Sequence, residues 1–145
     1  MASPFAVLTL KNAKEREGAT TVGLDMYAYK VPKHHGNTTF NISDDIPQED
    51  RRQFAYWRKF NALHGWMERR AREAGWTEEF NVVPFKLDAA LLDQLESELD
   101  ILEPVQGFFF GAQEVHPDDV RDAKTFIEEA RSALDLYDVY YNSWW

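Results

Sequence analysis

The sequence contains no cysteine, which excludes a disulfide framework, a thiolate nucleophile and a cysteine-ligated metal. It also has no apolar run close to the roughly 18 residues that a transmembrane helix needs. Residues 1–10 lack the positively charged region that opens a secretory signal. We therefore expect a protein of the cytoplasm with no membrane partner.

The motifs of the common catalytic and cofactor-binding classes are missing as well. The sequence has no Walker loop, no dinucleotide-binding glycine triplet, no zinc-peptidase helix and no nucleophile elbow. The run His116-Pro117-Asp118-Asp119, with Glu114 nearby, is better interpreted as the acidic first turn of a helix, where carboxylates complement the helix dipole, than as a metal site. We expect no catalytic residue, no metal and no cofactor, although these absences alone do not exclude an enzyme.

Aromatic residues are abundant, and the charges are segregated along the chain. The 145 residues fit one domain, and they include 10 Phe, 6 Tyr and 5 Trp. Residues 51–74 carry seven Arg or Lys against two Glu, whereas residues 88–138 carry fourteen Asp or Glu against three Arg or Lys. Two interpretations fit: the two parts lie against each other and the remaining acids keep the protein in solution, or the acidic half presents carboxylates to a basic partner.

A long helix is predicted in the middle of the chain, with Pro47 in its first turn and Gly75 at its end. An apolar stripe with helical spacing runs along Tyr56, Phe60, Leu63, Met67, Ala71 and Ala74. A second stripe beside it carries Trp57, Asn61 and His64, which need polar partners or a pocket if they are buried.

The remaining segments predict an α+β fold, with about three helices packed on one face of a mostly antiparallel sheet of four to five strands. We expect strands at residues 23–31, 80–87, 108–110 and 139–144, the first and the last of which should be central. Two further helices should follow Asp88, as an N-cap, and Pro117. Residues 23–145 form a single domain in this prediction, and residues 1–22 an N-terminal arm of uncertain order.

Three segments together resemble a protein family: Gly23-Leu24-Asp25-Met26-Tyr27, Tyr56-Trp57-Arg58-Lys59 followed by Asn61 and Leu63-His64-Gly65-Trp66, and residues 107–111 with the terminal Ser143-Trp144-Trp145. They are similar to small uncharacterised proteins of phages, prophages and bacteria that begin Met-Gly-Leu-Asp-Met-Tyr. Here Val22 stands in place of that initial Met, and 22 residues precede the motif. The resemblance implies a mobile-element origin and supplies no activity.

One functional hypothesis is a pocket for a nucleotide or another phosphorylated metabolite, which would be bound or sequestered. Aromatic rings could stack a base, and Arg58 could bind a phosphate. The residues expected to converge there are Asp25, Tyr27, Trp57, Arg58, Asn61, His64, Phe109 and Trp144.

The leading hypothesis is a phage or prophage accessory protein that binds and inhibits a host protein complex, either one that handles nucleic acid or one that serves in host defence. It would act in the host cytoplasm through acidic helices and would not bind nucleic acid directly. The carboxylates expected on this surface are Glu96, Glu98, Asp100, Asp122, Glu128 and Glu129. The sequence leaves open whether the protein forms a homo-oligomer.

Overall fold

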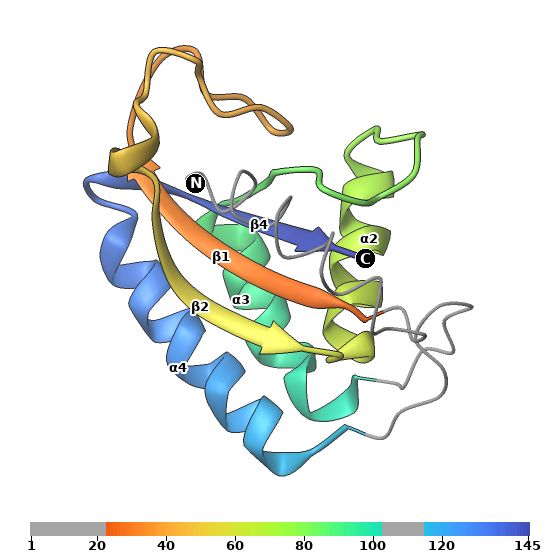
Figure 1. Cartoon of the computed structure of the whole chain (residues 1–145). Coiled ribbons are helices and arrows are strands. Elements are labelled where there is room, and N and C mark those ends of the chain that lie inside the picture. The colour runs from red at the N-terminus through yellow and green to blue at the C-terminus, as the bar shows by residue number, and fades with distance from the viewer. Residues whose placement is uncertain (1–22, 103–114) are drawn as a thin grey trace.

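The computed structural model describes residues 23–102 and 115–145, which form an antiparallel sheet backed by three α-helices (Figure 1). The strands are β1 (Asp25–Pro32), β2 (Arg52–Arg58), β3 (Phe85–Leu87) and β4 (Tyr137–Trp144). The helices are α2 (Asn61–Glu73), α3 (Ala89–Glu98) and α4 (Pro117–Ala133), with short 3-10 turns η1 (Gln48–Asp50) and η2 (Leu99–Ile101). The strand order is β2-β1-β4-β3, so the predicted α+β class and the central position of the first and last strands are confirmed.

Strand β1 shows the alternation that its sequence predicts. Leu24, Met26 and Ala28 are fully buried in the core between the sheet and the helices. On the opposite face Tyr27 and Tyr29 are also buried, and the half-buried Trp144 packs against them. The central strand is therefore covered on both faces.

The long helix predicted from Pro47 to Gly75 is wrong in its first half. Residues 52–58 form β2, because Trp57 pairs with Met26 and Arg58 pairs with Asp25 across to β1. Lys59 then adopts a left-handed conformation (φ 59°), and its N–H donates to the Leu24 carbonyl at 2.8 Å. Helix α2 consequently begins only at Asn61.

The apolar stripe of that prediction holds only from Phe60 to Ala71, since Ala74 at the end of α2 is exposed. Phe60, Leu63, Met67 and Ala71 are buried, as expected for the core face of α2. Tyr56 belongs to β2 and is 47% exposed. Its four-residue spacing from Phe60 therefore does not place the two side chains on one helix face.

Helices α3 and α4 begin where the sequence indicates. The side chain of Asp88 caps α3 by accepting a hydrogen bond from the Leu91 N–H at 2.8 Å. Pro117 occupies the first turn of α4. The buried face of α3 consists of Leu92 and Leu95, continued by Leu99 of η2, and that of α4 consists of Ala123, Phe126, Ile127, Ala130 and Ala133.

The strand predicted at residues 80–87 is shorter than expected, since only Phe85–Leu87 pair with β4. The preceding loop instead binds the end of the chain: Asn81 exchanges two hydrogen bonds with the Trp145 main chain, at 2.7 and 2.9 Å. Val82 donates its N–H to the Ser143 carbonyl and has a φ of 60°. The strand predicted around residues 108–110 and the N-terminal arm lie outside the described residues.

A left-handed backbone at a β-branched residue is strained by about 1–2 kcal/mol, so Val82 is a site where glycine should be tolerated or favoured. We expect Val82→Gly to leave the free energy of unfolding unchanged or raise it by up to about 1 kcal/mol, since glycine also increases the entropy of the unfolded chain. The matched control is the buried neighbour Val83, where glycine should cost about 2 kcal/mol or more. Urea denaturation of both variants measures the difference, and equal losses would contradict the strain at Val82.

Candidate functional site

The residues of the predicted pocket are divided between the two faces of the sheet. Asp25 and Arg58 lie opposite each other in the register of β1 and β2, and Trp144 lies opposite Asp25 in that of β1 and β4. Trp57 is one residue from Arg58 and therefore points to the other face, toward α4. His64 lies in the first turns of α2, on the core side with Tyr141. Phe109 lies outside the described residues.

Asp25 is the centre of a polar cluster at one end of the sheet. Its buried carboxylate oxygen Oδ1 accepts hydrogen bonds from the Tyr56 hydroxyl at 2.6 Å and from the Arg58 guanidinium at 2.9 Å. Burial, followed by the hydrogen bond to Asp25, raises the pKa of Tyr56 to about 12. The charge of Arg58 is therefore already engaged by Asp25, and a phosphate would have to compete for it.

Glycine at position 23 makes room for this arrangement. A Cβ built on Gly23 would lie only 2.5 Å from a terminal nitrogen of the Arg58 side chain. The guanidinium thus lies directly against the backbone that leads into β1.

His64 is enclosed by the core. It is 4% exposed, its Nδ1 lies 2.6 Å from the Tyr141 hydroxyl, and its ring packs 5.5 Å from that of Phe80 between centroids. Burial lowers the pKa of His64 to about 4 and raises that of Tyr141 well above its usual value. The imidazole is therefore neutral near pH 7, and Asn61 beside it is equally buried.

Half of the predicted acidic surface is engaged by cations or donors of the chain itself. Arg131 holds Glu96 and Asp93, each at 2.7 Å, and its hydrogen bond keeps the pKa of Glu96 below the usual value. Glu98 accepts from the Trp66 indole at 2.9 Å, which lowers its pKa. Asp100 lies 3.9 Å from Lys124.

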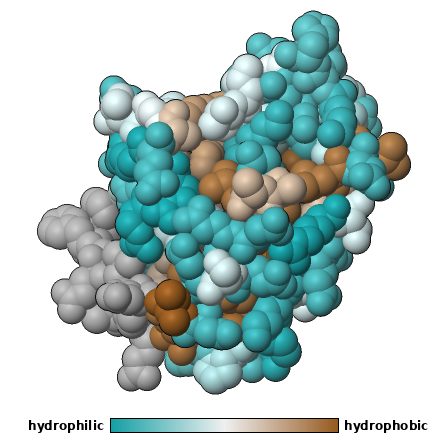
Figure 2. Space-filling view, turned by 180° about the vertical axis from the view of Figure 1, so that it is seen from behind, coloured by the Kyte–Doolittle hydropathy of each residue, from teal (hydrophilic) through white to brown (hydrophobic). Residues whose placement is uncertain are grey.

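The other three predicted carboxylates lie on the exposed side of α4. Asp122 has a long contact of 3.9 Å with Arg121. Glu128 and Glu129 are exposed, and no ion pair to either is found within the described ranges. Figure 2 shows the side of the molecule behind the sheet of Figure 1, where the surface is mostly hydrophilic with smaller hydrophobic areas.

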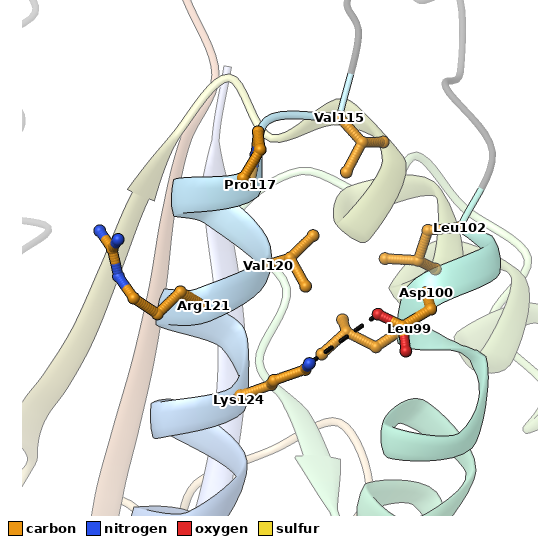
Figure 3. A pocket seen from close by; sticks show the side chains of 8 residues that line it. All are labelled: Leu99, Asp100, Leu102, Val115, Pro117, Val120, Arg121 and Lys124. Atoms are coloured by element: carbon orange, nitrogen blue, oxygen red, sulfur yellow. Dashed lines mark ion pairs between the residues drawn. The ribbon is translucent and has the colours of Figure 1, made fainter.

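A cavity of about 550 Å³ lies between η2 and the first turns of α4 (Figure 3). Leu99, Leu102 and Val120 give it apolar walls, and Lys124 reaches across toward Asp100. Arg121 is directed away from the space. The charges facing this cavity thus pair with each other.

A second cavity of about 450 Å³ lies beside β3 and the end of α2, and a third of about 190 Å³ lies between β2 and α4. Neither Asn61 nor His64 lines any of the three. The third cavity contains Trp57, whose indole Nε1 is buried without a hydrogen-bond acceptor in the part of the chain that the structure describes.

The sequence did not predict the pairing of Tyr56 with Asp25 or the third cavity, which is the groove between β2 and α4. Both depend on residues 52–58, which were expected to form a helix. The alternation of Ala55 and Trp57 with Tyr56 and Arg58, in a segment rich in aromatic residues, was the available signal for a strand.

Comparison with protein-family models, with curated proteins and with solved structures finds no match to this chain. Among the described residues no group of His, Asp or Glu is placed to hold a metal ion. No helix in the described ranges is long and apolar enough to cross a membrane.

Protonation of His64 should make stability depend on pH. The unfolded state, with a His pKa near 6.5, binds more protons than the native state below that pH, so the free energy of unfolding should fall as pH drops from 6.5 to 4, by about 3 kcal/mol. In His64→Gln this part of the pH dependence should disappear, whereas His35→Gln, at an exposed position, should retain it. Urea midpoints between pH 7.5 and 4.5 test this, and an equal slope in all three proteins would contradict it.

Proposed function

We propose that this protein is a non-enzymatic accessory protein of a phage or prophage that binds a host protein complex through the acidic side of α4. The observation that carries the proposal is that Asp122, Glu128 and Glu129 are exposed along one helix and, among the described residues, are not neutralised by close ion pairs. The carboxylates of α3, by contrast, mostly accept hydrogen bonds from other side chains of the same molecule.

Carboxylates on a rigid helix are suited to a basic surface of a partner. A host complex that handles nucleic acid presents Lys and Arg to phosphates, and a row of carboxylates can occupy the same groove and accelerate encounter electrostatically. The net charge of −9 opposes direct binding to nucleic acid. The resemblance to phage and prophage proteins supports the mobile-element origin, with action in the host cytoplasm.

Binding of a nucleotide or phosphorylated metabolite is the second proposal. The cluster of Asp25, Tyr56 and Arg58 supports it, because the Arg58 side chain remains 48% exposed. The enclosed His64 and the pairing of Arg58 with Asp25 give it less support than the protein-binding proposal. A nucleotide would raise the melting temperature of the wild-type protein but not that of Arg58→Gln.

The triple variant Asp122→Lys, Glu128→Lys and Glu129→Lys tests the leading proposal. We expect it to lose most of the host proteins that the tagged wild-type chain retains from lysate at low salt, with association to a purified partner slowed by about tenfold or more. Its thermal stability should stay close to that of the wild type, since all three sites are exposed.

The matched control reverses three exposed acids away from α4: Asp44→Lys, Glu78→Lys and Glu79→Lys, which produce the same change in net charge. Retention by the control and loss by the α4 variant would support the acidic side of α4 as the interface. Equal retention by both variants, or recovery of the tagged chain alone from the lysate, would overturn it.

A further inference from the structure

Strand β2 forms one edge of the described sheet, and α4 runs beside it (Figure 1). The two elements enclose the groove of about 190 Å³. Its floor is aromatic, because the ring of Phe126 lies 5.6 Å from that of Phe54 and 5.2 Å from that of Trp57 between centroids. Thr125, Asp122 and Glu129 contribute the side formed by α4.

The main chain of β2 offers hydrogen-bonding groups along this edge. The Lys59 N–H points to β1, where it donates to the Leu24 carbonyl. In an antiparallel pair successive residues alternate in direction, so the N–H and C=O groups of Trp57 also point to β1, and those of Tyr56 and Arg58 point outward. An open row of this kind is a template for an added strand.

Trp57 adds a second, independent feature. The residue lines the groove and is 3% exposed, and its Nε1 donor, which is itself buried, has no acceptor in the described part of the chain. A buried donor of this kind costs free energy until an acceptor reaches it. A turn of the indole toward the groove would let a main-chain carbonyl of an occupant supply that acceptor.

The charges determine which occupant fits. A second copy of this chain, pairing antiparallel about Ala55, would place Arg52 of one copy opposite Arg58 of the other, and like charges opposite each other destabilise a strand pair. Asp122 and Glu129 at the groove call instead for a cation on the incoming segment. The complementary occupant is therefore an extended, basic segment of a different protein.

We propose that β2 and the groove beside α4 bind an extended segment of the partner protein by strand addition, with apolar and basic side chains alternating along the one face that is turned to α4. The apolar side chain packs on Phe54 and Phe126, a Lys or Arg two residues along pairs with Asp122 or Glu129, and the segment's main chain bonds to Tyr56 and Arg58. This inference rests on the proposed protein-binding function and specifies the binding mode and the chemistry of the partner.

The probe is a capped ten-residue peptide added to the full-length protein, with valine and lysine in turn at the odd positions and serine at the even positions, so that valine and lysine share one face. We expect binding by fluorescence anisotropy that weakens with salt, and NMR amide shifts concentrated at Tyr56 and Arg58. N-methylation of the peptide at every odd position in one version, and at every even position in another, should weaken binding about tenfold in the version that blocks the paired amides. The same peptide with glutamate in place of lysine should not bind.

Protein variants test whether the peptide binds in the groove or is attracted only by the negative charge of the protein. The double variant Asp122→Asn and Glu129→Gln should weaken peptide binding about tenfold, whereas Asp118→Asn with Asp135→Asn, which removes the same charge near the two ends of α4 outside the groove, should change it less than twofold. Trp57→Phe should weaken it about fivefold, the contribution of one hydrogen bond, while keeping the aromatic floor.

The outcomes distinguish this inference from the proposed function. Equal weakening by the two double variants, or no effect of either N-methylated peptide, would overturn strand addition even if lysate proteins are still captured through α4. A wild-type protein that is dimeric through β2 by sedimentation and amide shifts would also overturn it. Loss of lysate capture with intact, groove-specific peptide binding would contradict the proposed function alone.

Discussion

The pairing of β1 with β4 is the contact on which the rest of the structure depends. Its register runs without a break from Asp25 opposite Trp144 to Pro32 opposite Tyr137. Each of these central strands then receives one edge strand, β2 on β1 and β3 on β4. The helices cover the face that this pair creates, so both the core and the groove beside β2 require it.

Most of the fold could be predicted because its signals are local. The alternation in β1, the Asp88 cap of α3 and the Pro117 start of α4 each depend on a few adjacent residues. Strand β2 could not be predicted in the same way, because Tyr56, Phe60 and Leu63 also satisfy the spacing of a helix. The pairing of Trp57 with Met26 decides between the two, and it joins residues distant in sequence.

The candidate site was predictable in part for the same reason. Asp25 and Arg58 were expected to lie together, and they do, at 2.9 Å. Trp57 was also expected there. Because side chains alternate along a strand, Trp57, one residue before Arg58, points to the opposite face of the sheet. The partner of His64 could not be inferred, since Tyr141 lies 77 residues away along the chain.

The central pairing of β1 with β4 also has a consequence for how the protein folds. The two strands are separated by more than a hundred residues, so closing them costs loop entropy before the sheet gains any edge strand. During synthesis β1 must remain without its main partner until β4 has emerged from the ribosome. Folding should therefore be late and slow for a chain of this length, as in proteins of high contact order, although α2, α3 and α4 can form locally beforehand.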